Sequence, residues 1–181
     1  IVDIGGGTTE VAVISLNGVV TKNAIKVAGD VMDHDIQNYF RNTHRLEIGD
    51  RTAEQIKISV GSAMRSRSKN ILVKGRDLVS GIPKTIDVRS DEIRQALKDS
   101  VKRILEVVKD ALESTPPELS SDIIDRGILV AGGGAQLRGL DQVIREKTNV
   151  PCNVVEEPHL AIVKGCGKII EDLEKYKHVL I

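Results

Sequence analysis

Short runs of β-branched and aliphatic residues open the chain and are separated by turns. The runs at residues 1–4 and 11–16 predict two strands, because apolar β-branched runs of this length favour extended structure. Asn17-Gly18 is typical of a two-residue hairpin turn, and a third strand is expected over 19–27. The first part of the chain is therefore predicted to be a β-meander.

Helical spacing of apolar residues replaces this strand pattern after residue 29. Asp30 is the expected N-cap of a first helix. A capping box of Thr52 and Gln55 predicts a second helix that runs through Ala63. The first helix is supported by apolar residues three or four positions apart, namely Met32, Ile36 and Phe40.

The middle of the chain predicts a loop followed by strands. Residues 64–70, MRSRSKN, are basic and polar and are expected to form an exposed loop. The segment 71–88 predicts two or three strands, interrupted at Gly75, Gly81 and Pro83. We therefore expect a small unit at about 45–89 that is inserted into the rest of the fold.

The longest helix is predicted to begin at a Ser90 cap and to stop at Pro116-Pro117. Apolar residues at helical spacing support it: Ile93, Leu97, Val101, Ile104, Val108 and Leu112.

Strands and helices alternate in the remainder of the chain. RGILVAGGG at 126–134 predicts a buried strand that runs into a glycine turn, and 151–157 predicts another strand. Pro158 is expected to open the last helix, with Leu173 on its apolar side. The helix between these strands is marked by Leu137, Leu140 and Ile144. The pattern as a whole predicts an α/β lobe with an insert.

Composition excludes several classes of protein. The chain has 181 residues, and its 26 basic and 26 acidic residues cancel, so it lacks the basic footprint of a nucleic-acid-binding protein. No apolar run has the length of a transmembrane segment, and no secretory leader is seen. Cys152 and Cys166 are too few for a disulfide framework, so we expect reduced, structural cysteines in a cytoplasmic protein. Since Ile1 already lies inside an apolar strand, the chain is expected to be a fragment or an excised lobe.

The first glycine turn suits the phosphates of a nucleotide. Gly5, Gly6 and Gly7 follow a strand, and glycine amides bind phosphate oxygens without a Cβ in the way. The hydroxyls of Thr8 and Thr9 add donors, and Asp3 could hold a hydrated Mg²⁺ or orient water. The alternative is a tight hairpin that binds nothing, with Asp3 as a solvated residue at the strand edge.

A second glycine turn makes the nucleotide hypothesis coherent. The sequence AGGGA at 131–135 follows an apolar strand and precedes a helix, as in ligand sites at the carboxyl edge of a sheet. Neither turn matches the dinucleotide fingerprint or the P-loop. One turn would bind the phosphates and the other the nucleoside.

These segments resemble a known family. VDIGGGTTEVAV resembles the second phosphate motif of the actin-like ATPase superfamily, and ILVAGGGAQLRGLDQVI resembles its adenosine motif. VAGDVMDHDI, IGDRTAEQIKISVGSA and VKGRDLVSGIPKTIDV are similar to the MreB family of bacterial actins. The resemblance implies one lobe of an actin-like (ribonuclease H-like) α/β fold, in which helices flank a mixed sheet. Residues 1–45 and 90–181 would form its core subdomain, 46–89 a small α+β insert, and the first lobe would be absent.

The same resemblance implies roles for individual residues. Asp3 would act near Mg²⁺ and the lytic water, and Thr8 would also position that water. Glu54 and Lys57 match a motif that lies along the ribose and base, although residues three apart on a helix more often form a surface ion pair. Gly165 and Gly167 would lie where the lobes are linked. The implied nucleotide ligands are Gly5, Gly6, Gly7 and Thr8 for the phosphates and Gly132, Gly133, Gly134 and Ala135 for the adenosine.

The implied function is that of an ATP-binding, filament-forming bacterial actin. Its full-length members are ATPases that use Mg²⁺, maintain rod shape and organise cell-wall synthesis with partner proteins at the membrane. This lobe alone is expected to be inactive. Three alternatives share the fold: a magnetosome-organising filament protein, a sugar or acetate kinase lobe, and a chaperone ATPase lobe. The kinase needs a catalytic base beyond Asp3, and the chaperone needs a peptide-binding β domain.

Overall fold

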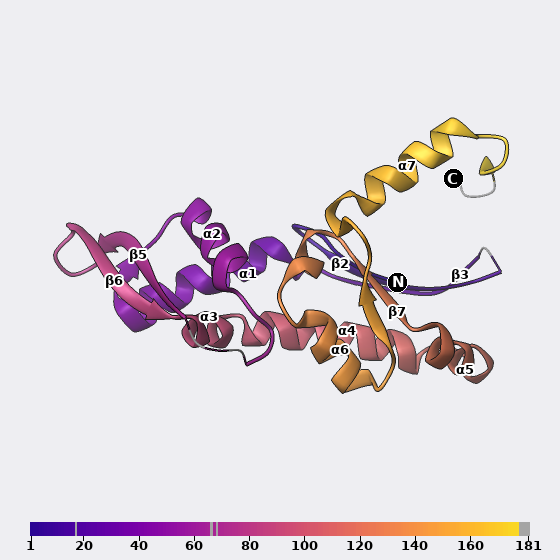
Figure 1. Cartoon of the computed structure of the whole chain (residues 1–181), viewed down its shortest axis with the longest axis horizontal. Helices are drawn as coiled ribbons and strands as arrows, with labels where there is room; N and C mark the ends of the chain where they lie inside the picture. Colours follow the sequence, from indigo (N-terminus) through magenta and orange to yellow (C-terminus); the bar gives the residue numbers. More distant parts are fainter. Residues whose placement is uncertain (17, 66, 68, 178–181) are drawn as a thin grey trace.

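The computed structural model describes residues 1–16, 18–65, 67 and 69–177. Within these residues the strands form two sheets, which lie side by side along the long axis of the molecule (Figure 1). The larger has the strand order β3-β2-β1-β7-β8, and the smaller has the order β4-β5-β6. Helices flank the larger, mixed sheet, which confirms the predicted α/β class.

The larger sheet begins with the predicted meander. β1 (Val2–Ile4), β2 (Thr9–Ser15) and β3 (Gly18–Ile25) are antiparallel neighbours. β7 (Ile128–Ala131) pairs in parallel with β1, and β8 (Cys152–Val154) pairs in parallel with β7. Asn17, half of the predicted hairpin turn, lies outside the described residues.

One face of this sheet is covered by α4 (Lys98–Glu113) and α6 (Leu140–Thr148). Successive strand residues point to opposite faces, so alternate residues such as Val2, Ile4 and Val130 are buried in the core. Leu129, between two buried residues of β7, points to the other face and is 45% exposed. The sheet therefore has one covered face and one open face.

The predicted longest helix is two helices. α3 (Ser90–Ala96) precedes α4, and the break falls at Leu97, which caps both. Ser90 is the first residue of α3 and does not act as its cap, because its hydroxyl accepts a hydrogen bond from the Lys69 amide at 3.0 Å. The Arg89 amide instead donates to the Glu92 carboxylate at 3.0 Å.

A further helix, α5 (Pro117–Arg126), was not predicted. Pro117 was interpreted only as the stop of the preceding helix. Proline also suits the first turn of a helix, since its missing amide has no partner there. None of the residues of α5 is buried, so its apolar spacing gave little signal.

The first helix after the meander is α1 (Gly29–Tyr39), which continues into a π-helical turn, η1 (Phe40–His44). The prediction that Asp30 is its N-cap is wrong: Ala28 takes that place, and Asp30 lies in the first turn. The amide of Asp30 donates to the carbonyl of Gly6 at 2.9 Å, so a distant backbone group replaces the side-chain cap.

The smaller sheet lies within the segment predicted to be an insert. Its strands are β4 (Leu46–Glu47), β5 (Asn70–Asp77) and β6 (Pro83–Arg89). The prediction that Gly75 interrupts a strand is wrong, because Gly75 lies inside β5 and pairs with Lys84. Its missing side chain lets Leu46 pack 2.8 Å from the position of a Cβ. The division into two subdomains stays a prediction, because one continuous core joins both sheets.

The predicted capping box of α2 (Asp50–Val60) is wrong. Gly49 is the N-cap, and its carbonyl accepts from the amides of Thr52 and Ala53, so the helix starts before the box. It also ends at Val60, before the predicted Ala63. α2 packs along α1.

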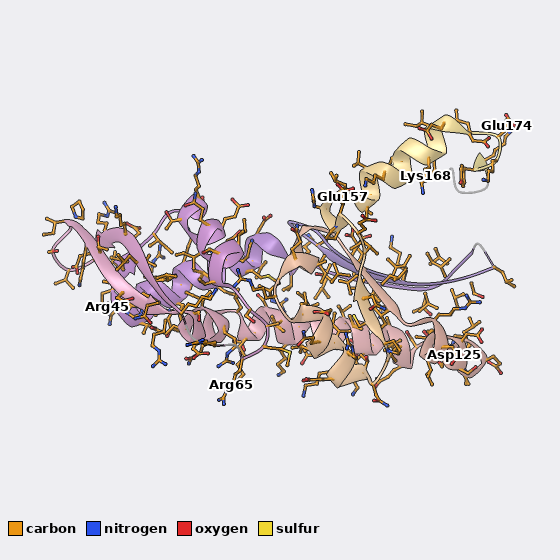
Figure 2. All side chains as sticks on the ribbon, viewed as in Figure 1. Arg45, Arg65, Asp125, Glu157, Lys168 and Glu174 are labelled. Carbon is orange, nitrogen blue, oxygen red and sulfur yellow. The ribbon has the colours of Figure 1, made fainter. Side chains whose placement is uncertain are left out.

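Pro158 does not open the last helix, as the sequence had predicted. It opens a 3-10 turn, η3 (Pro158–Leu160), and the last helix, α7 (Ala161–Glu171), follows that turn. This helix stands away from both sheets, and Figure 2 shows Lys168 on it and Glu174 beyond its end. Leu173, predicted to lie on the apolar side of this helix, lies beyond its end. Of the two cysteines, Cys152 is buried in the core and Cys166 is exposed, so only Cys152 fits the predicted structural role.

In the part of the chain that the structure describes, no helix combines the length and apolarity that crossing a membrane requires.

Candidate functional site

The two glycine turns lie together at one edge of the larger sheet. β1 and β7 are parallel neighbours with Asp3 opposite Ala131, so the loops that follow them leave the sheet side by side. We call residues 5–8 the first glycine loop and residues 132–135 the second. A Cβ added to Gly132 would lie 2.5 Å from Oδ1 of Asp3, which shows how closely they approach.

The first glycine loop closes a tight turn between β1 and β2. The Gly5 amide donates to the Thr8 carbonyl at 2.9 Å, and Ile4 pairs with Thr9. No described residue accepts a hydrogen bond from the amides of Gly6, Gly7 or Thr8. Unpaired amides on a glycine turn are the donors that phosphate oxygens require.

The two threonines after the glycines differ in role. Thr8 is exposed. Thr9 is fully buried, and its hydroxyl donates to the Val27 carbonyl at 2.6 Å. Of the two hydroxyls, only that of Thr8 is therefore open to a ligand, and the prediction that Thr9 also offers a donor is wrong because its hydroxyl is bound to Val27.

The first glycine loop rests on the N-terminus of α1. The amides of Gly29 and Asp30 donate to the carbonyls of Gly5 and Gly6 at 3.1 and 2.9 Å. A Cβ on Gly29 would lie 3.4 Å from the Gly5 carbonyl oxygen and 3.5 Å from the Gly6 Cα. The loop is thus fixed to a helix far along the chain, which the sequence did not predict.

The second glycine loop is equally constrained. Gly132 has a φ of +84°, and its amide donates to the Pro158 carbonyl at 2.9 Å. A 3-10 turn, η2 (Gly133–Gln136), follows, and Gly134 lies against the side chain of Ile4. The first amides of such a turn have no partner within it, so they are free to face a ligand.

A cavity of about 390 Å³ lies between the two loops, α1 and α2. Its size is within the range of small-molecule sites. From the first loop and α1 it is lined by Gly5, Gly6, Gly29, Asp30, Met32 and Asp33. From α2 and the second loop it is lined by Glu54, Lys57, Ile58, Gly61, Gly133, Gly134, Gln136 and Leu137.

Lys57 does not pair with Glu54, the ordinary expectation for two residues three apart on a helix. Its ammonium donates to Oδ2 of Asp33 at 2.7 Å and to the Gly29 carbonyl at 2.9 Å. Burial raises the pKa of Asp33, and the hydrogen bond from Lys57 offsets only part of this effect. Oδ1 of Asp33 is buried without a partner among the described residues.

Asp3 is a carboxylate that the described protein leaves unsatisfied. Its Oδ1 is buried and has no hydrogen-bond partner among the described residues. Burial, and then the charge of Glu10, raise the pKa of Asp3. Glu10 lies directly opposite Asp3 in the β1–β2 pairing, so the two carboxylates share the open face of the sheet. Sequence reasoning missed Glu10, although two-residue periodicity across the turn was the available signal.

The structure brings together six of the predicted ligands on the cavity wall: Gly5, Gly6, Glu54, Lys57, Gly133 and Gly134. Asp3 and Gly132 adjoin one another at the end of the sheet but do not line the cavity. Gly7, Thr8 and Ala135 lie in the two loops beside it. Gly165 and Gly167 lie on α7, away from this cavity.

Comparison with known proteins identifies the family. The profile of the family described as MreB/Mbl protein matches residues 1–178. The cell shape-determining protein Mbl of Bacillus subtilis (strain 168) is 49% identical over 176 residues, which are 97% of this chain and 53% of Mbl. The chain thus spans about half the length of the curated relatives it matches.

Solved structures point to the same family as the sequence comparisons. Crystal structures of MreB5 of Spiroplasma citri bound to ADP and to AMPPNP superpose with TM-scores of 0.93 and 0.92 at 36% identity, over 98% of this chain and 54% of MreB5. The MamK double helical filament is a more distant neighbour, with a TM-score of 0.79 and 25% identity over 94% of this chain and 53% of MamK. The fold is therefore the actin-like one, and the chain belongs to the MreB/Mbl family.

Proposed function

We propose that this chain is the second lobe of an ATP-binding bacterial actin homologue, which forms filaments and maintains rod shape by organising cell-wall synthesis. The observation that carries the proposal is the meeting of two glycine loops at one sheet edge over one cavity. If the first glycine loop were only a tight hairpin that binds nothing, there would be no reason for the second loop to lie beside it, with Gly132 packed against Asp3.

Within this site, the first glycine loop would bind the phosphates through the free amides of Gly6, Gly7 and Thr8. The second loop would lie along the adenosine, with Glu54 at the ribose and base. The MreB5 structures with ADP and AMPPNP support a nucleotide, since that relative matches 98% of this chain.

The charges of the cavity argue for a cation beside the nucleotide. Asp30, Asp33 and Glu54 line it together with one lysine, Lys57, so a triphosphate alone would meet a negative wall. Mg²⁺ is usually bound by one or two protein carboxylates and keeps several of its waters. Asp3, with its unsatisfied oxygen, and Glu10 would hold its waters, and the ion would supply charge neutralisation at the phosphates.

Hydrolysis would be direct attack of water on the γ-phosphate. Asp3 would accept a hydrogen bond from that water, and the Thr8 hydroxyl would help to position it, so catalysis would rest on positioning and charge stabilisation. We expect this chain alone to be inactive. The open face of the larger sheet, where Leu129 is 45% exposed, supports a first lobe that covers this face and completes the site.

Assembly into filaments is proposed on the example of MamK, which is described as a double helical filament. A head-to-tail contact between subunits does not close on itself and therefore propagates. We further propose that the full-length polymer is cytoplasmic, associates with the membrane and works with cell-shape and cell-wall-synthesis proteins there.

The test uses the full-length protein that carries these residues. Calorimetry should show Mg²⁺-dependent ATP binding, and sedimentation should show assembly with ATP. Thr8→Ala should bind adenosine normally and lose ATP hydrolysis. Absence of ATP binding would contradict the nucleotide site, and only monomer at high protein concentration with ATP would contradict the filament.

A further inference from the structure

The C-terminal end of α2 is bound to the segment that follows the second glycine loop. From this contact we propose that Arg138 is a positioning residue, which fixes α2 relative to the second glycine loop and so sets the width of the cavity where the nucleoside would lie. The part of this role that concerns a ligand rests on the proposed nucleotide function. We call the four contacting residues, Ser59, Ser62, Ala63 and Arg138, the α2 junction.

Arg138 binds the end of α2 through both its side chain and its backbone. Its guanidinium donates a hydrogen bond to the Ser59 carbonyl at 2.7 Å. Its own carbonyl accepts from the Ala63 amide at 2.9 Å, and Ser62 forms a parallel β-bridge with it. Ser59 and Arg138 are 79 positions apart, so the α2 junction joins two segments that are distant in the sequence.

The Ser59 carbonyl is one of the groups that a helix cannot satisfy by itself. α2 ends at Val60, and the last four carbonyls of a helix have no amide partner within it. Arg138 supplies that partner, and its positive charge is also favourable at the C-terminal end of a helix. Loss of the guanidinium would leave this end of α2 without its side-chain anchor.

Ser62 gives the turn after α2 its shape. The residue is only 6% exposed, and its hydroxyl lies 2.8 Å from the Met64 carbonyl and 3.2 Å from the Arg138 carbonyl. A hydroxyl has one hydrogen, so the shorter contact is its main hydrogen bond and closes the turn at 62–64. The closed turn directs the Ala63 amide toward Arg138.

The α2 junction lies at the edge of the cavity. Gly61 and Leu137, the chain neighbours of Ser62 and Arg138, line the cavity from its two sides. A Cβ on Gly61 would lie 3.1 Å from Cδ1 of Leu137, so the two walls touch here. Elsewhere α2 packs mainly on α1 and α3. The α2 junction is therefore the contact that fixes α2 relative to the second glycine loop.

The first experiment needs no nucleotide. Hydrogen exchange at the Ala63 amide of the full-length protein reports its bond to Arg138, and it should be about tenfold faster or more in Arg138→Leu. The control is Arg103→Leu, at an exposed arginine of α4 that does not line the cavity, which should leave this exchange unchanged. Unchanged exchange in Arg138→Leu would overturn the positioning role.

The second experiment measures the affinity of adenosine, ADP and ATP for the same full-length proteins. If Arg138 sets the width of the nucleoside part of the cavity, Arg138→Leu should weaken all three ligands by the same factor, about fivefold or more. A loss that grows with the number of phosphates would overturn the inference in favour of a charge that acts directly on them. A lower Tm with unchanged affinities would overturn it in favour of a role in stability alone.

Ser62→Ala separates positioning from direct contact between Arg138 and the nucleoside. It removes the hydroxyl that closes the turn and leaves Arg138 in place, so it should weaken the three ligands in the same pattern as Arg138→Leu. Because both residues act through the α2 junction, the double variant should lose less affinity than the product of the two single factors. Losses that multiply would show independent roles and refute the inference.

Arg138→Lys is the conservative variant. It keeps a positive charge and a donor for the end of α2, so it should lose less affinity than Arg138→Leu. Equal losses would refute the bond to the helix end as the cause. If the unmodified full-length protein binds no ATP, the proposed function fails, whereas the exchange rate at Ala63 still decides whether Arg138 positions α2.

Discussion

A Cβ atom on Gly132 would lie 2.5 Å from Oδ1 of Asp3, so the second glycine loop fits against the end of β1 only because residue 132 has no side chain. The residue also has a φ of +84°, which disfavours any other amino acid. The approach of the two loops therefore depends on one glycine.

Gly132→Ala should destabilise the protein strongly. The combined clash and backbone strain should cost about 3 kcal/mol of unfolding free energy or more, measured by urea denaturation. Gly133→Ala is the matched control, since nothing lies within 4 Å of its added Cβ, and it should change stability by less than about 1 kcal/mol. Equal effects of the two substitutions would contradict the close approach.

Asp3→Asn should raise the stability of the nucleotide-free protein at pH 7. A raised carboxyl pKa means that the folded state binds the proton more tightly than the unfolded state, so the charged form opposes folding above that pKa. Removing the charge should raise Tm by on the order of 2 °C in calorimetric scans without metal.

In the same scans, the Tm difference between Asp3→Asn and the unmodified protein should shrink as pH falls through the raised pKa of Asp3, because the unmodified carboxyl then becomes neutral as well. Glu10→Gln should give a smaller rise at pH 7, because it removes only the repulsion from Asp3. A lower Tm in Asp3→Asn would show that its charge makes a stabilising contact.

Substitutions of the adjacent residues Thr8 and Thr9 should differ in their effect on stability. Thr9→Val removes a buried hydroxyl and leaves the Val27 carbonyl without its donor, which should cost about 1–3 kcal/mol in urea denaturation. Thr8→Val changes an exposed side chain and should alter the unfolding free energy by less than about 0.5 kcal/mol. A larger loss of unfolding free energy in Thr8→Val than in Thr9→Val would contradict the hydrogen bond from Thr9 to Val27.

Glu92 should make stability depend on pH in the acid range. Partial burial alone would raise its pKa, but hydrogen bonds from the Arg89 amide and from His44, at 3.0 and 2.7 Å, hold that pKa below its ordinary value. The resulting stability is present above the ordinary pKa of glutamate and is lost as pH falls through the lowered one.

Glu92→Gln should therefore lower the unfolding free energy by about 1 kcal/mol at pH 7 and by less at an acid pH below the lowered pKa of Glu92, where the unmodified carboxylate is protonated. Chemical denaturation at the two pH values measures this difference. Glu106→Gln, at an exposed pair with Lys102, is expected to have little effect at either. A loss from Glu92→Gln that does not depend on pH would argue against the charge as its cause.

Local sequence signals predicted most elements but not how they begin. Apolar spacing located α1 and α6, and a capping-box pattern located α2. The predicted caps of α1 and α2 are nevertheless wrong, because backbone carbonyls accept hydrogen bonds from amides at the start of each helix. Gly6, which accepts from Asp30, is 24 positions away in sequence, and no local pattern reports such a contact. α5 was missed because all of its residues are at least partly exposed.

The candidate site could be predicted where it consists of backbone and not where it depends on packing between helices. Both glycine loops follow strands, so their meeting followed from sheet topology alone. Asp33 and Gly29 became visible only when α1 lay against α2, because their partner Lys57 comes from the other helix.

The parallel pairing of β1 with β7 has a consequence for how any closing motion works. Both loops continue from strands that share one ladder, and Gly132 and Gly134 fit against the end of β1. They cannot separate without breaking that ladder, so within this chain they move as one body. Opening and closing around a ligand must then come from whatever approaches the cavity from outside.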